Sequence, residues 1–261
     1  MVRISGRERR FFPRYKQHYQ KHVARHGVES ESQLAKRIIG WVFQPKFTIA
    51  LIIANIAVYF WSQTWTQEFF DSLIFRPAVI YSLNFMPVIS SWFLHANPAH
   101  LIGNLIFLFV FGRVVERRFG AAKTAFIYFG AAIISDLISG LVFQQGGIGA
   151  SGAIAGLIAA AVIADPFYLN YIVFGLPIPI VVLGWVAIFT DILGLIQPIQ
   201  SNIGHIAHLA GFFGISLLVF LINSRDKKIR TGFFINVLTV AAGLVIYFMF
   251  PDIARRILEY Q

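Results

Sequence analysis

The sequence contains no cysteine and has few charged residues. Without cysteine there is no disulfide, no thiolate metal ligand and no cysteine nucleophile. Asp, Glu, Lys and Arg make up 13% of the 261 residues, whereas 57% are hydrophobic. A soluble domain carries roughly 25% charged residues, and so large an apolar excess does not fit inside one water-facing globule. The composition therefore indicates a protein that folds in a lipid bilayer.

Acidic residues are especially scarce, and the basic ones are unevenly distributed. There are 12 Asp and Glu against 22 Lys and Arg, which gives a net charge of +10. Eleven of the basic residues lie between Arg3 and Lys46, ahead of the first apolar span. Segments of this kind usually face the cytoplasm and anionic lipid headgroups. We therefore interpret residues 1–44 as a basic cytoplasmic arm whose partner is the lipid bilayer and not nucleic acid.

Seven apolar spans follow the arm and predict an all-α, polytopic transmembrane helical bundle. Their approximate bounds are 47–62, 98–112, 121–143, 151–164, 172–196, 204–223 and 231–250. Basic residues favour one side of this bundle, because the connections at 113–123 and 225–230 carry four each. The positive-inside rule then predicts a cytoplasmic N-terminus and a C-terminus on the other side.

The fourth span is too short to cross the membrane as a helix. It runs from Ser151 to a stop at Asp165–Pro166, and gives about 21 Å of helix against a hydrocarbon core of about 30 Å. The Gly-rich connection before it, 146–149, would then dip into the membrane beside water and place Ser151 about 10 Å below the outer surface. The alternative is that the bounds of this span are misjudged, and that its helix crosses the membrane by tilting or by thinning the bilayer.

Two polar side chains are expected to meet this serine at its own level, and a third is expected just above it. The cap and proline at 97–98 mark the start of the second helix, which puts Asn104 about 10 Å deep and His100 one turn above it. With a sixth helix starting near 201–202, His208 lies at a similar depth. Polar groups at membrane depth are usually functional, although a lone Ser, His or Asn there more often bonds its own backbone or joins helices.

This set of side chains suits nucleophilic acyl transfer. A Ser hydroxyl needs a base to take its proton, and neutral His is the usual base. Asn104, His100 and the backbone N–H of Ser151 can donate to the oxyanion that forms. His205 and His208 are three apart and could share a metal, but no third carboxylate or His ligand is spaced alongside, and no HExxH is present. We expect Ser151 as nucleophile, His208 as base, and no cofactor or metal.

Four motifs, in order along the chain, resemble those of the rhomboid family of intramembrane serine proteases. They are HANPAHLIGN at 95–104, ERRFG at 116–120, GASG at 149–152 and AHLAG at 207–211. The resemblance covers residues 45–223 and implies a six-helix catalytic core with a Ser–His dyad that needs no Asp. It also implies substrates that are single-pass transmembrane proteins and a first loop, 63–97, that His95 helps to order and that lies partly in the membrane. Residues 224–261 would add a basic cytoplasmic loop, a seventh helix and a short tail, and the active site would open on the non-cytoplasmic side.

Three positions have no role in this interpretation. Ala155 stands where the family often has an aromatic that stacks on the catalytic His. Asp191, near the outer end of the fifth helix, is expected to be solvated. Asp136, midway along the third, needs a partner because a carboxyl group at depth is costly when alone.

Two other functions compete with the protease. One is an inactive relative that binds membrane clients, although this chain keeps both Ser151 and His208. The other is a small transporter with a His and Asp proton relay, although no inverted repeat is visible. The sequence predicts nothing about oligomeric state.

Overall fold

The computed structural model describes residues 43–82, 84–170, 176–195 and 204–249, together with Ser32, Lys36 and residues 39–40. The chain divides into two compact units, Met1–Gln44 and Pro45–Gln261. The predicted basic arm, 1–44, falls almost entirely outside the described residues. The helices that carry the motifs all belong to the second unit.

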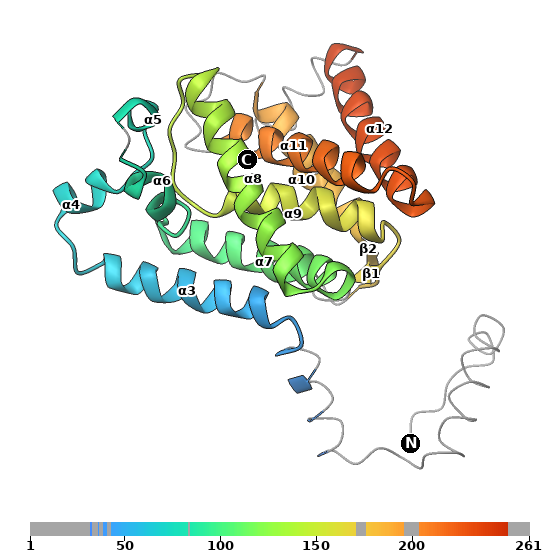
Figure 1. Ribbon diagram of the computed structural model, residues 1–261, viewed down its shortest axis with the longest axis horizontal. Coiled ribbons are helices and arrows are strands. Elements are labelled where there is room, and N and C mark those ends of the chain that lie inside the picture. Colours follow the sequence, from blue (N-terminus) through green and yellow to red (C-terminus); the bar gives the residue numbers. More distant parts are fainter. Residues whose placement is uncertain are drawn as a thin grey trace, which may run out of the picture. The chain divides into compact units, whose positions relative to one another are not determined.

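Apolar helices in the described part of the chain form the second unit (Figure 1). They are α3 (Lys46–Ser62), α7 (Pro98–Phe119), α8 (Ala121–Leu141), α9 (Ser151–Ala164), α10 (Ile180–Gly194), α11 (His205–Asn223) and α12 (Lys227–Met249). Within the described residues, α7, α8, α11 and α12 are long and apolar enough to cross a membrane, while α3, α9 and α10 are apolar but shorter. The chain is therefore an all-α, polytopic membrane protein, as the sequence predicts.

Two connections have structure of their own among the residues that the structure describes. In the described part of the segment between α3 and α7 there are three short helices, α4 (Gln67–Ser72), α5 (Val79–Ser82) and α6 (Met86–Ser91). Between α9 and α10, strand β1 (Leu169–Asn170) pairs antiparallel with strand β2 (Ile178–Pro179).

Helix α9 lies in the middle of the bundle and contacts α7, α8, α10, α11 and α12 (Figure 1). Every side chain from Ala153 to Ala164 is buried. The sequence of α9 is made of Gly, Ala and branched aliphatic residues, apart from Ser151, and small residues let membrane helices approach closely. One close approach is the crossing with α11, where a Cβ added at Gly211 would overlap the carbonyl oxygen of Gly152.

The helix ends that matter most for the site agree with the sequence. Helix α9 begins at Ser151 and ends at Ala164, so it has 14 residues and is too short to span the bilayer alone. The alternative of a misplaced boundary is thereby excluded. Asn97 caps α7 by accepting the backbone N–H of His100 at 2.9 Å, with Pro98 in the first helical position.

Four predicted bounds are wrong. Helix α12 starts at Lys227 and not at 231, so most of the predicted basic loop belongs to the helix. Helix α7 continues past residue 112 to Phe119, because Arg113 and Glu116 are buried and not part of a solvated loop. Helix α10 starts at Ile180 and not at 172, since two prolines and the β1–β2 pairing occupy the residues directly before it. Helix α11 starts at His205 and not near 201–202, so His208 lies in its first turn and not six or seven residues into the helix.

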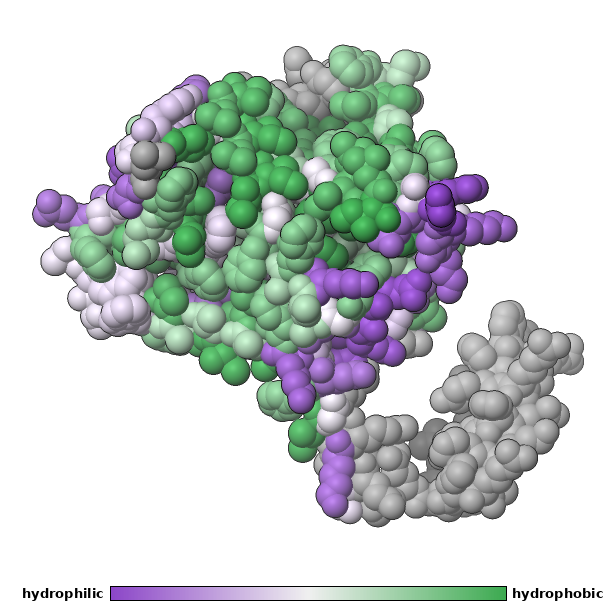
Figure 2. Space-filling view, viewed as in Figure 1, coloured by the Kyte–Doolittle hydropathy of each residue, from purple (hydrophilic) through white to green (hydrophobic). Residues whose placement is uncertain are grey.

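One end of the bundle is basic. Arg118, in the last turn of α7, pairs with Asp226 in the α11–α12 connection at 3.6 Å. Arg117 donates to the Tyr168 hydroxyl at 3.2 Å and lies over the Tyr168 ring. In Figure 2 hydrophilic residues gather along this side, while much of the remaining surface in that view is hydrophobic. Because consecutive helices alternate in direction, the N-terminal ends of α7, α9 and α11 lie at the other end.

Glu116 joins α3 to α7 at the basic end. Its carboxylate accepts the backbone N–H groups of Phe47 and Thr48, each at 2.9 Å, and the Thr48 hydroxyl at 2.7 Å. The first N–H groups of a helix have no partner within the helix, so this carboxylate caps α3 from a distance of 68 residues along the chain.

Candidate active site

Ser151 is the first residue of α9 and follows a tight connection. Gly149 has a φ of +114°, which glycine adopts without strain. Its N–H donates to the carbonyl of Ser91 at 2.8 Å, and the N–H of Gly147 donates to the carbonyl of Phe75 at 3.0 Å. Both acceptors belong to the 63–97 segment, so this segment holds the backbone that leads into Ser151. The Ser151 side chain stays partly exposed.

Helix α7 brings His100 and Asn104 to this connection. A Cβ added at Gly149 would lie 2.8 Å from Cε1 and Nε2 of His100 and 3.9 Å from Nδ2 of Asn104. Asn104 is buried, and its Nδ2 donates to the His100 carbonyl at 2.8 Å. The ring of His95 packs edge-on against that of His100, with 5.1 Å between the centroids. The two predicted residues of α7 therefore lie beside the backbone that precedes Ser151.

His208 reaches the same region from α11. The residue before it, Ala207, accepts the hydroxyl of Ser135 from α8 at 2.8 Å, and its carbonyl oxygen lies 3.9 Å from a Cβ added at Gly152. The structure thus brings together the segments that carry all four predicted residues, at the ends of α7, α9 and α11.

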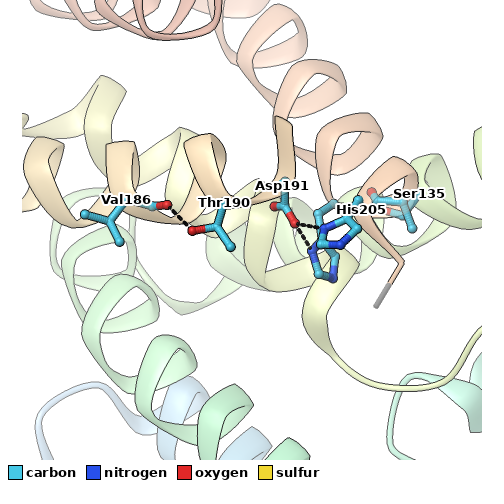
Figure 3. Close-up of polar contacts among 7 residues, drawn as sticks. Ser135, Val186, Thr190, Asp191 and His205 are labelled. Atoms are coloured by element: carbon cyan, nitrogen blue, oxygen red, sulfur yellow. Dashed lines mark hydrogen bonds and ion pairs between the residues drawn. The ribbon is translucent and has the colours of Figure 1, made fainter. Parts of the chain in front are cut away.

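Asp191 is the residue that sequence reasoning missed. Its Oδ1 lies 2.8 Å from Nδ1 of His208 and 2.9 Å from Nδ1 of His205, and Figure 3 shows both contacts as dashed lines beside the labelled His205. With 7% of its surface exposed, Asp191 is not the solvated helix end that the sequence suggests. Asp191 lies in the last turn of α10. The periodicity of a sequence describes one helix at a time, so it could not show that Asp191 meets the histidines of another helix. The signal in the sequence was a carboxyl group at the end of one apolar helix, followed by two histidines at the start of the next.

The same three side chains bear on the sequence argument about metal ligands. Asp191, His205 and His208 each place one ligand atom within 4.8 Å of the others. A carboxylate therefore accompanies the two histidines, contrary to the expectation that no third ligand is available. Two imidazoles and one carboxylate are a donor set that divalent transition metals accept.

Two other predicted positions are now explained. The carboxylate of Asp136 accepts the indole N–H of Trp92 at 2.7 Å, so the partner that the sequence did not name lies in the 63–97 segment. Ala155, one turn after Ser151, is 3% exposed and offers only a methyl group. No ring is present at that position to hold the imidazole of His208.

The fold and the site together define a multi-pass membrane protein with Ser, His, Asn and Asp side chains gathered at one end of its bundle. Residues 82–225 match the family model of the Rhomboid domain. The chain is 34% identical over 197 residues to the rhomboid protease AarA of Providencia stuartii, an alignment that covers 63% of this chain and 68% of that protein. Over 189 residues it is 28% identical to the rhomboid protease GlpG of Haemophilus influenzae, with 71% and 94% covered.

A third relative is the mitochondrial RHOMBOID-like protein 12 of Arabidopsis thaliana, 28% identical over 188 residues, with 62% of this chain and 54% of that protein covered. The chain belongs to the rhomboid family. It is accordingly a serine-type endopeptidase of the membrane.

Proposed function

We propose that Ser151 is the nucleophile and His208 the general base of this endopeptidase. The observation that carries the proposal is the meeting of three helix ends around residues 149–152. His100 and Asn104 of α7 lie beside Gly149, and the Ala207 carbonyl of α11 lies beside Gly152. Nucleophilic catalysis by serine needs a hydroxyl and a neighbouring base, and α9 and α11 supply this pair of groups from adjacent helix ends.

The reaction needs one proton carrier and no other co-reactant than water. Ser151 Oγ attacks the peptide carbonyl carbon while its proton moves to Nε2 of His208, and the carbonyl π pair moves to the oxygen. Collapse of this intermediate breaks the C–N bond, and His208 gives the proton to the leaving amine. Water then attacks the acyl ester, passing a proton to His208, which returns it to Ser151 Oγ as the ester bond breaks.

Asn104, His100 and the Ser151 backbone N–H are proposed to stabilise the oxyanion. The first N–H groups of a helix have no partner within the helix and point toward an approaching anion. One N–H of the Asn104 amide donates to the His100 carbonyl, which leaves the second for substrate. Each such donor contributes on the order of 3 kcal/mol to the transition state.

We also propose that the site opens on the non-cytoplasmic side of the membrane. The basic residues at the end of α7 and the start of α12 lie at the opposite end of the bundle from Ser151, and basic ends usually face the cytoplasm. As a helix, α9 is about 21 Å long against a hydrocarbon core of about 30 Å, so Ser151 lies below the outer surface.

The substrates are proposed to be single-pass transmembrane proteins. A site sunk into the bilayer meets segments that enter the membrane before it meets soluble chains. A peptide bond must also leave its helical hydrogen bonds before Ser151 can attack it. Substrate helices weakened by glycine, proline or other small residues near the cut are therefore favoured.

The test is cleavage of a model single-pass substrate in liposomes by the wild-type protein, Ser151→Ala and His208→Ala. We expect both variants to lose activity by about 10³-fold or more. Ser72→Ala is the matched control, because the Ser72 hydroxyl is exposed and donates to its own helix. A fluorophosphonate should label the wild type covalently and leave Ser151→Ala unlabelled. Wild-type cleavage by Ser151→Ala would refute the assignment.

A further inference from the structure

We infer that Asp191 positions His208, so that the catalytic centre operates as a Ser–His–Asp triad supplied by α9, α11 and α10. This inference rests on the proposed function of Ser151 and His208. It departs from the resemblance, which implies a dyad that needs no Asp. Asp191 touches neither the substrate nor Ser151 in this scheme, and acts through the imidazole of His208.

The geometry is that of one acceptor shared by two rings. Oδ1 of Asp191 lies 2.8 Å from Nδ1 of His208 and 2.9 Å from Nδ1 of His205 (Figure 3). The three side chains are 10%, 16% and 9% exposed, in that order, so water competes little for these contacts. Within the described residues, no other side chain forms a hydrogen bond with the His208 ring. Asp191 is therefore the group that fixes the rotation of this imidazole.

The shared oxygen also selects the tautomer of His208. A carboxylate accepts hydrogen bonds and cannot donate them, so each Nδ1 that faces Asp191 carries a hydrogen. A neutral imidazole with its hydrogen on Nδ1 has its lone pair on Nε2, at the opposite edge of the ring. Asp191 thus keeps His208 in the form that can take the Ser151 proton.

Asp191 gains importance in the transition state. As the proton moves from Ser151 Oγ to Nε2, His208 becomes a cation, and the carboxylate at its Nδ1 stabilises that charge. The interaction is strong because the Asp191–His208 contact is largely shielded from water and needs no reorganisation during the reaction. The proton stays on His208 until it passes to the leaving amine, so Asp191 remains ionised throughout.

His205 holds Asp191 in place. A single buried carboxylate is costly in a membrane helix, and the second N–H donor offsets part of that cost. The His205 ring is itself clamped, since a Cβ added at Gly194 would overlap it. The last turn of α10 therefore carries both Asp191 and Gly194, the glycine that packs against the His205 ring. Because Ala155 provides no ring at its position, these contacts are what orients His208.

The test compares Asp191→Leu and Asp191→Asn with the wild type in the liposome assay. Leucine has a similar shape and removes the acceptor, and we expect kcat to fall by about 10²–10⁴-fold with KM unchanged. Asparagine keeps an acceptor oxygen without the charge, and we expect a kcat between the two. Thr190→Val is the matched control, because the neighbouring Thr190 hydroxyl donates to the Val186 carbonyl of its own helix. That variant should retain wild-type kcat.

A second readout reports the tautomer directly. In protein labelled with ¹⁵N-histidine, we expect His208 to show hydrogen on Nδ1 in the wild type and to lose that signature in Asp191→Leu. A folded Asp191→Leu variant with wild-type kcat and an unchanged His208 spectrum would overturn the inference. If the leucine variant does not fold, Asp191→Asn decides, and wild-type kcat in it would have the same consequence.

The two failures are distinguishable in the same assay. If Ser151→Ala is inactive while Asp191→Leu is fully active, the triad is refuted and the Ser–His dyad remains. If Ser151→Ala is active, the proposed function of Ser151 is refuted as well.

Discussion

Trp92 donates its indole N–H to the carboxylate of Asp136 at 2.7 Å, across 44 residues of sequence. Asp136 lies in the second half of α8, and Trp92 directly follows α6. The preceding residue, Ser91, accepts the N–H of Gly149 at 2.8 Å. This pair therefore fastens the 63–97 segment to α8 at the point where that segment supports the backbone leading to Ser151.

Replacing Trp92 with phenylalanine should leave the Asp136 carboxyl group buried without its donor. We expect the free energy of unfolding to fall by about 1–3 kcal/mol, measured by thermal or denaturant unfolding in detergent. In the double variant with Asp136→Leu, much of this loss should be recovered because no unpaired polar group remains. Trp61→Phe, at an exposed tryptophan on α3, is the control and should have little effect. Equal losses in the single and double variants would contradict the pairing.

Gly211→Ala should disturb the crossing of α9 and α11. Its Cβ would overlap the Gly152 carbonyl oxygen, and overpacking of this kind costs about 1–3 kcal/mol. Because Ser151 and His208 lie next to this crossing, proteolytic activity should fall together with stability. Gly103→Ala is the matched control, since no atom lies within 4 Å of the added Cβ, and a helix-interior alanine gains about 0.5–1 kcal/mol. Similar behaviour of the two variants in both assays would argue against the close crossing.

Asn104→Ala should lower kcat by about 10²–10³-fold through the loss of one oxyanion donor. Asn55 provides a matched control, because its Nδ2 donates to the Leu51 carbonyl of its own helix at 2.8 Å, as that of Asn104 does to His100. Asn55→Ala should reduce stability without changing kcat of the folded protein. The comparison is made by measuring kcat per labelled active site. A wild-type kcat for Asn104→Ala would remove Asn104 from the oxyanion site.

His95 should make stability depend on pH. Burial, with a smaller effect of the neighbouring His100, lowers the pKa of His95 from 6.5 to about 4. Between pH 6.5 and about 4, the unfolded protein binds a proton at His95 that the folded protein does not bind. The free energy of unfolding should therefore decrease as pH falls from 6.5 toward 4. Melting temperatures across this range should fall less steeply for His95→Gln than for the wild type. Parallel curves would show that His95 does not contribute.

The sequence was a good guide where one helix carried the whole signal. The ends of α9 could be predicted because Pro166 stops the helix and the Gly-rich run precedes Ser151. The Asn97 cap of α7 was equally local. Relationships between helices were out of reach: Asp191 and His208 lie 17 residues apart on separate helices, and Trp92 and Asp136 lie 44 apart. Counting residues from a presumed start also failed for α11, because Gly204 is not helical and the helix begins at His205.

From Ala153 to Ala164, α9 has no side chain at the surface of the bundle. The helix that carries Ser151 therefore has almost no contact with lipid tails, and the bilayer acts on it only through the helices around it. Membranes of different thickness would tilt α3 and α12, whose apolar faces are exposed, before they displaced α9. The position of Ser151 therefore depends little on the composition of the membrane, whereas the outer helices adjust to the membrane.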